Sequence, residues 1–227
     1  WDSPEARKPE VLRAVRDEAI AMNKKYAKRF GIPASSSVTA VKPSGTVSQT
    51  VNCASGMHPR HSEYYIRRIR ISATDSLFKM LKDQGVPYHP EVGQSEDDAN
   101  TFVLEFPVKS PKSSVYNNDL SAIEQLEYWK LVKENYTEHN PSVTISIGDD
   151  EWVGVANWLY ENWEMIGGLS FLPRSNHSYR LAPYEACDKE TYEKLAKKFE
   201  NIDYSKIVAY ELRDETEQAR ELACAGG

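Results

Sequence analysis

Hydrophobic positions recur at helical spacing in five stretches of the chain. They predict helices over residues 9–30, 75–84, 119–139 and 189–199, and a Trp-rich helix from residue 149 to about residue 167. Gly31 directly after the first stretch is typical of a helix C-cap, and Asp75 is typical of an N-cap.

Shorter stretches of alternating or β-branched residues predict strands. These stretches are residues 37–42, 101–108, 142–147, 169–172 and 207–212, of which residues 169–172 are expected to form a buried strand. Helices and strands therefore alternate, which predicts an α/β fold with parallel strand pairings. The polar tail after residue 212 is expected to be mobile.

Composition narrows the functional classes. The 227 residues carry a net charge of -6, which argues against a general nucleic-acid binder, and no apolar run approaches the roughly 18 residues of a membrane span. Three widely spaced cysteines exclude a disulfide scaffold and favour a reducing compartment, the cytoplasm. The chain starts with Trp1 and stops at Gly227 in a polar segment, so we expect a piece of a longer protein.

The charge is unevenly distributed. Residues 1–90 carry 15 Lys and Arg against 8 Asp and Glu, a net charge of +7, whereas the remainder carries 13 against 26, a net charge of -13. This asymmetry suggests that the first part faces an anion, although basic side chains usually lie on solvated faces. The densest basic group is Arg67, Arg68 and Arg70, beside two tyrosines.

The strongest local motif follows the first predicted strand. Its candidate phosphate-binding residues are Pro43, Ser44, Gly45, Thr46, Val47 and Ser48. Hydroxyls and backbone N–H groups at a turn bind phosphate well, and a glycine permits close approach of the backbone. The spacing is not that of a Walker loop, and a capped turn without any ligand explains the residues equally well.

A second cluster contains Cys53, His58, Arg60 and His61. The spacing of the cysteine and histidines lacks a fourth ligand and matches no structural zinc pattern, so no metal site is predicted. The small residues and the glycine between them favour a tight backbone crossing beside a site. His58, Arg60 and His61 either face an anionic ligand or are satisfied within the fold.

Several motifs together resemble the C-terminal part of a ribonucleotide reductase. More narrowly, they resemble the adenosylcobalamin-dependent class II enzymes of the monomeric ribonucleoside-triphosphate reductase type. The motifs are residues 41–49 (VKPSGTVSQ), 54–62 (ASGMHPRHS), 64–67 (YYIR), 122–127 (AIEQLE), 141–146 (PSVTIS), 168–173 (GLSFLP) and 221–227 (ELACAGG).

The resemblance implies a fold, a reaction and a cofactor. Residues 1–212 would be the C-terminal portion of a ten-stranded α/β catalytic barrel, and residues 213–227 a truncated mobile redox tail. The whole enzyme would reduce ribonucleoside triphosphates to 2'-deoxyribonucleotides by thiyl-radical chemistry with adenosylcobalamin, which makes the radical in place. In the family, the loop matching residues 43–48 holds the substrate's phosphates.

The resemblance also assigns a role to one cysteine. Cys224 matches the first of two tail thiols that re-reduce the active site and are themselves reduced by thioredoxin; the second would fall two residues beyond Gly227. The radical cysteine and the acid/base residues of the family lie upstream of this chain. We therefore expect activity only together with an N-terminal partner that carries them.

Two other hypotheses remain open. The chain is alternatively a stand-alone nucleotide- or phosphate-binding module without catalytic activity, which would not need a tail thiol. It is otherwise a non-functional remnant, which should aggregate through exposed strand edges.

Overall fold

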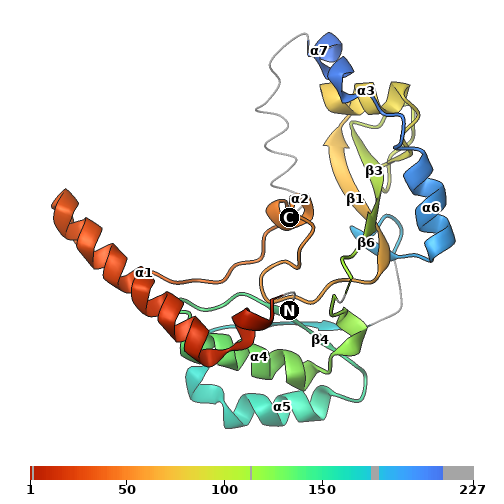
Figure 1. Cartoon of the computed structure of the whole chain (residues 1–227). Coiled ribbons are helices and arrows are strands. Elements are labelled where there is room, and N and C mark those ends of the chain that lie inside the picture. Colours follow the sequence, from red (N-terminus) through yellow and green to blue (C-terminus); the bar gives the residue numbers. More distant parts are fainter. Residues whose placement is uncertain (2, 113, 175–178, 212–227) are drawn as a thin grey trace. The chain divides into compact units, whose positions relative to one another are not determined.

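The computed structural model describes residues 1, 3–112, 114–174 and 179–211, which form two compact units. Unit 1 comprises Trp1–Arg60 and Ser110–Asn176, and unit 2 comprises His61–Lys109 and His177–Gly227. Each unit is thus built from two separated stretches of sequence (Figure 1). The predicted boundary at residue 212 falls at the edge of the described residues and stays a prediction.

Unit 1 packs helices against a two-stranded parallel sheet. Its elements are η1 (Pro4–Arg7), α1 (Pro9–Phe30), α2 (Val47–Thr50), η2 (Asn117–Asp119), α4 (Ala122–Asn135), β4 (Thr144–Ile147), α5 (Trp152–Glu161), η3 (Trp163–Met165) and β5 (Ser170–Pro173). β4 and β5 pair in parallel, with Thr144 opposite Ser170. The predicted parallel pairing is confirmed for these two strands.

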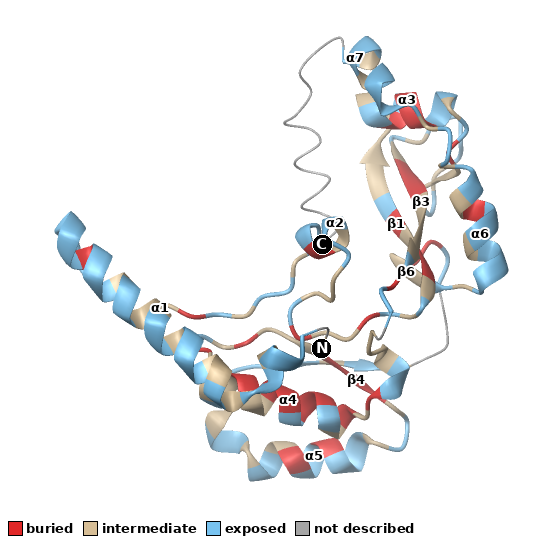
Figure 2. Cartoon of the chain, viewed as in Figure 1, coloured by how far each residue is buried: buried red, intermediate tan, exposed pale blue. Residues whose placement is uncertain are grey.

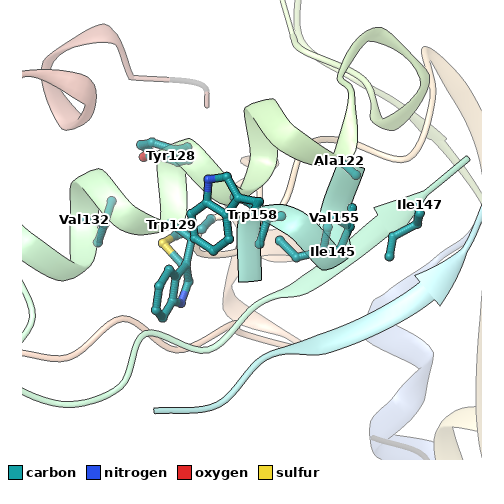
Figure 3. Close-up of a cluster of buried hydrophobic side chains, with 10 residues drawn as sticks. Ala122, Tyr128, Trp129, Val132, Ile145, Ile147, Val155 and Trp158 are labelled. Carbon is teal, nitrogen blue, oxygen red and sulfur yellow. The ribbon is translucent and has the colours of Figure 1, made fainter. Parts of the chain in front are cut away.

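The core of unit 1 lies where α4, β4 and α5 meet (Figure 3). Trp129 of α4 and Ile145 and Ile147 of β4 have no solvent exposure. The buried indole still satisfies its polar atom, because Trp129 Nε1 donates to the Pro141 carbonyl oxygen at 3.0 Å. Burial of these side chains fixes β4 and the loop before it.

Helix α1 has the predicted bounds but an unexpectedly open surface. Gly31 ends it in the left-handed region, with a φ of 68°, where glycine is favoured. Ala27 is its one buried residue, whereas buried positions recur along α4 (Figure 2). Val15 and Phe30 keep 52% and 66% of their surface exposed, so much of the apolar side of α1 has no partner among the described residues.

Unit 2 is a four-stranded antiparallel sheet packed against short helices. Its elements are β1 (Tyr64–Ser72), α3 (Ser76–Asp83), β2 (Tyr88–Pro90), β3 (Thr101–Lys109), β6 (Tyr184–Ala186), α6 (Lys189–Lys197), η4 (Tyr204–Lys206) and α7 (Ile207–Tyr210). The strand order is β2-β3-β1-β6. Phe78 of α3 stacks on Phe102 of β3, with ring centroids 4.5 Å apart, at the centre of its core.

The structure corrects several predicted elements. Residues 37–42 form no strand, and residues 207–210 form helix α7 where a strand was predicted. β5 is present but not buried, since Leu172 is 60% exposed. The expected parallel pairing does not extend to unit 2, whose described strands are all antiparallel.

The segment over residues 37–42 makes backbone hydrogen bonds to the stretch over residues 138–142 without forming a regular strand pair. Thr39 accepts from the N–H groups of Glu138 and His139, and the Val41 carbonyl oxygen accepts from Ser142 N–H. The facing stretch includes Pro141, which has no N–H to donate. The pairing is therefore interrupted where a regular strand would need it.

Candidate functional site

The predicted phosphate loop lies in unit 1 and leads into the single turn of α2 (Figure 1). Ser44 Oγ accepts from Ser48 N–H at 2.9 Å, and Ser48 Oγ donates to the Ser44 carbonyl oxygen at 2.9 Å. Ser48 is 2% exposed. These two hydroxyls therefore shape the loop from inside, as in a capped turn.

The outer side of the loop carries unused donors. Among the described residues, the backbone N–H groups of Gly45, Thr46 and Val47 have no acceptor, and all three residues are exposed. A Cβ atom added at Gly45 would meet nothing within 4 Å, so the space beside this backbone is open. Three consecutive unbonded N–H groups on exposed residues can donate hydrogen bonds to the oxygens of an anion such as phosphate.

A second stretch of chain crosses tightly under the loop. Ser55 Oγ accepts from Ser44 N–H at 2.8 Å and donates to the Ser44 carbonyl oxygen at 2.9 Å. A Cβ added at Gly56 would lie 3.3 Å from the Lys42 carbonyl oxygen, and its φ of 57° also favours glycine. The predicted tight backbone crossing is confirmed, and sequence reasoning had not identified the contribution of Ser55.

His58 and Arg60 both make hydrogen bonds within the fold. The His58 ring bonds Ser55 and Thr144, each at 3.0 Å. The buried Arg60 guanidinium donates to the Asn52 carbonyl oxygen at 2.7 Å. Of the two interpretations of these residues, the structure favours bonds within the fold. Asn52 lies two residues after the end of α2 and has a φ of 50°. The bond from Arg60 therefore holds the chain where it leaves that turn.

His61 belongs to unit 2 and lies among aromatic rings. Its ring centroid is 5.9 Å from that of Tyr65 and 5.7 Å from that of Tyr184.

In the part of the chain that the structure describes, no three His, Cys, Asp or Glu side chains are grouped as they would be to hold a metal ion. No described helix is long and apolar enough to cross a membrane.

Two of the three arginines of the basic cluster of β1, Arg68 and Arg70, pair with carboxylates within unit 2. Arg68 Nε donates to Glu105 at 2.8 Å, and its guanidinium also bonds Glu185 at 2.5 Å. Burial lowers the pKa of Arg68, but its bonds to the two carboxylates outweigh burial and raise that pKa overall. Arg70 pairs with Glu91 in the same unit. These arginines are therefore occupied by carboxylates of unit 2.

The cysteines differ in what the structure shows of them. Cys53 and Cys187 are free thiols and partly buried. Burial raises the pKa of the Cys187 thiol, and the carboxylates of Asp188 and Glu185 raise it further. A raised pKa reduces the thiolate fraction that performs exchange. The predicted redox thiol, Cys224, lies outside the described residues.

Comparisons with known proteins support the resemblance seen in the motifs. No family model matches the chain. The chain is 32% identical over 190 residues to a probable adenosylcobalamin-dependent ribonucleoside-triphosphate reductase of Dictyostelium discoideum, covering 82% of the chain and 24% of the relative. It is 32% identical over 219 residues to the adenosylcobalamin-dependent ribonucleoside-triphosphate reductase of Lactobacillus delbrueckii subsp. bulgaricus. This match covers 92% of the chain and 28% of the relative.

A solved structure extends the similarity to the fold. A crystal structure of a B12-dependent (class II) ribonucleotide reductase matches with a TM-score of 0.76 and 27% identity, covering 91% of this chain and 29% of that chain. The chain thus spans about a quarter of the length of the curated relatives that it matches.

Proposed function

The chain is homologous to one segment of the adenosylcobalamin-dependent ribonucleoside-triphosphate reductases, and we propose that it supplies the substrate-phosphate loop of such an enzyme. The reaction is the reduction of a ribonucleoside triphosphate to its 2'-deoxyribonucleotide. It requires an N-terminal reductase part, because the radical cysteine of the family has no counterpart in the motifs of this chain. The activity belongs to the assembled enzyme.

One observation carries the proposal. The motif over residues 43–48 forms a loop whose Ser44 and Ser48 hydroxyls are bonded within the fold, whereas the exposed residues Gly45, Thr46 and Val47 have backbone N–H groups without an acceptor among the described residues. A ligand can therefore bind without displacing a bond of the loop. Hydrogen bonds from fixed donors to phosphate oxygens position a substrate, and positioning supplies much of an enzyme's acceleration.

We propose that the two parallel strands, β4 and β5, belong to the catalytic barrel. An isolated two-stranded parallel sheet is unusual, since parallel sheets occur almost only as larger sheets covered on both faces. β5 pairs with β4 on one edge, and its other edge has no strand partner among the described residues of unit 1. We assign β4 and β5 to a ten-stranded barrel that the rest of the enzyme completes.

The tail provides the proposed redox function. Together with the second tail thiol of the family, Cys224, which lies between alanines and close to two glycines, would reduce the active-site disulfide to two thiols. The disulfide formed between the two tail cysteines would then be reduced by the dithiol of thioredoxin in the cytoplasm. The raised pKa of Cys187 makes that thiol a poor substitute. The proposal therefore expects maleimide at neutral pH to modify Cys224 before Cys187, measured by peptide mass spectrometry.

The relatives are named as adenosylcobalamin-dependent reductases, so the same cofactor is proposed for the assembled enzyme. When bound, this cofactor supplies the radical by homolysis of its cobalt–carbon bond. We assign no contact with the cofactor to any residue of this chain.

The decisive experiment reconstitutes the enzyme. The chain is mixed with the N-terminal part of a homologous class II reductase, adenosylcobalamin, reduced thioredoxin and a ribonucleoside triphosphate, and deoxynucleotide is measured. Gly45→Asp places a carboxylate in the open space beside the loop and should raise KM for the nucleotide at least about tenfold, a change equivalent to about 1.4 kcal/mol. Gly45→Ala is the matched control and should stay near the wild-type KM.

The outcomes separate the hypotheses. Deoxynucleotide formation with a raised KM in Gly45→Asp supports the proposal. A folded chain that gives no product in the mixture, yet binds nucleotide saturably by itself, would favour the stand-alone binding module. An unchanged KM in Gly45→Asp would exclude contact between this loop and the phosphates.

A further inference from the structure

The geometry points to Ser55 and His58 as positioning residues that hold the phosphate loop in its binding shape before any ligand arrives. This inference rests on the proposed role of the loop. Neither side chain belongs to residues 43–48, and neither needs to touch the ligand. Ser55 acts directly on Ser44, and His58 acts on it through Ser55.

Ser55 fixes the backbone of Ser44 from both sides. Its hydroxyl accepts from Ser44 N–H at 2.8 Å and donates to the Ser44 carbonyl oxygen at 2.9 Å. Ser44 Oγ in turn accepts from Ser48 N–H at 2.9 Å and so holds the turn of α2. The residues with exposed N–H groups lie between these two anchored serines, so Ser55 restricts the directions in which those groups point.

His58 connects this arrangement to the sheet. Thr144 N–H donates to Nε2 at 3.0 Å, so Nε2 carries a lone pair. In a neutral imidazole the other ring nitrogen then carries the hydrogen, and Nδ1 lies 3.0 Å from the Ser55 carbonyl oxygen. Thr144 is the first residue of β4, and Ile145 beside it is fully buried. His58 thus transmits the position of the rigid core to the loop.

Pre-ordering determines affinity. A loop that is fixed before binding loses little conformational freedom when the ligand arrives. A loop that visits several conformations binds more weakly in proportion to the fraction in the competent one. Loss of the His58 connection should therefore weaken phosphate binding without removing any group that contacts phosphate.

The first test needs no ligand. Amide hydrogen exchange at Ser44 and Ser48 is measured in the full chain for wild type, His58→Ala and the control His139→Ala, an exposed histidine of the same unit. Exchange at both amides should be about tenfold faster in His58→Ala, as expected for losing about one hydrogen bond, and unchanged in the control. Unchanged protection in His58→Ala overturns the inference.

The second test separates positioning from a general loss of stability. Inorganic triphosphate is titrated into each variant while the amide signals of Gly45, Thr46 and Val47 are followed by NMR. The apparent Kd should be about tenfold weaker in His58→Ala, at a temperature where the variant remains fully folded. His58→Asn keeps a donor near Ser55 and His58→Gln an acceptor near Thr144, so each should recover part of the affinity.

The two tests also distinguish this inference from the proposed function. If exchange at Ser44 accelerates but the wild-type chain shows no shift of the three amides with triphosphate, the phosphate role fails and the positioning of the loop stands. If triphosphate binds equally to wild type and His58→Ala, the phosphate role stands and the positioning role is refuted.

Discussion

The Ser48 hydroxyl donates to the Ser44 carbonyl oxygen, and the Arg60 guanidinium donates to the Asn52 carbonyl oxygen. Polar groups close to the loop thus hold its backbone, while exposed backbone N–H groups remain for the ligand. This division is physically sensible, because buried polar side chains must be satisfied within the fold. A ligand site formed by backbone N–H groups is not marked by charged or catalytic side chains.

Gly56 should be the glycine of this region most sensitive to substitution. Gly56→Ala forces a side chain into the left-handed region and within 3.3 Å of the Lys42 carbonyl oxygen. We expect a loss of about 1–2 kcal/mol in the free energy of unfolding, measured by urea denaturation. Gly154→Ala is the control: it lies in α5 with open space around it and should gain about 0.5–1 kcal/mol. Equal stabilities for the two variants would contradict the prediction.

Glu91 should make unit 2 sensitive to acid. Burial raises the pKa of this carboxyl, but the N–H of Val92 and the guanidinium of Arg70 outweigh burial and lower the pKa overall. A lowered pKa in the folded state stabilises the fold above the unfolded value, about 4.3, and this stabilisation is lost as the pH falls through the folded pKa.

Glu91→Gln tests this pH dependence. We expect the variant to lose up to about 1 kcal/mol at pH 7 and to approach wild type as the pH falls through the folded pKa of Glu91, where its carboxyl becomes protonated. Urea unfolding at several pH values measures the difference. Glu63→Gln, on an exposed residue before β1, is the control. A difference between wild type and Glu91→Gln that does not shrink as the pH falls would show another cause.

At the scale of elements, one carboxylate joins several parts of unit 1. Glu151 accepts from Ala122 N–H at the start of α4 at 2.8 Å and from Gly148 N–H after β4 at 2.6 Å. Arg174, just after β5, approaches it at 3.5 Å. Glu151 itself precedes α5. It therefore fixes the helix starts and the strand ends relative to one another.

Glu151→Ala should consequently destabilise unit 1 strongly. The variant leaves two backbone donors without their acceptor, and hydrogen bonds to a charged group contribute about 1.5–3 kcal/mol each. We expect the free energy of unfolding to fall by at least about 2 kcal/mol in thermal or urea denaturation. Asp149→Ala, an exposed neighbour, should change it by less than about 0.5 kcal/mol. A loss no larger than that of Asp149→Ala would refute the joining role.

At the scale of the whole molecule, unit 1 leaves apolar side chains exposed on β5 and α1. Leu172 is 60% exposed at a strand that has a partner on only one edge, and Phe30 at the end of α1 is 66% exposed. Exposed strand edges and apolar surface favour association. The homologous class II structure is more than three times as long as the aligned segment, so more chain is available there to cover such surfaces.

Leu172→Lys should separate folding of the chain from its assembly. The side chain is exposed in the described structure, so the stability of the chain should change by less than about 0.5 kcal/mol. If the N-terminal reductase part covers β5, loss of one buried leucine should weaken complementation by about 2 kcal/mol, roughly thirtyfold in Kd. Association is measured by analytical ultracentrifugation of the mixture. Val92→Lys in unit 2 is the control, and equal binding by both variants would place the assembly surface elsewhere.

The sequence by itself determined the features that depend on neighbouring residues. The bounds of α1, the Asp75 cap of α3 and the tight crossing at Gly56 all follow from local spacing and backbone chemistry. Ordered motifs along the whole chain also determined its resemblance to class II reductases, which the comparisons confirm.

Only the tertiary structure decided the features that depend on distant partners. β1 is a strand although it carries Arg68, because Glu105 and Glu185 lie across the sheet to compensate that charge. Residues 37–42 form no strand because the facing stretch contains Pro141, about a hundred positions away in sequence. His58 can position the phosphate loop only because the fold brings Thr144 beside it. Strand pairs, ion pairs and the hydrogen bonds of a histidine ring depend on which distant segments lie next to one another. The local spacing of residues does not determine those contacts.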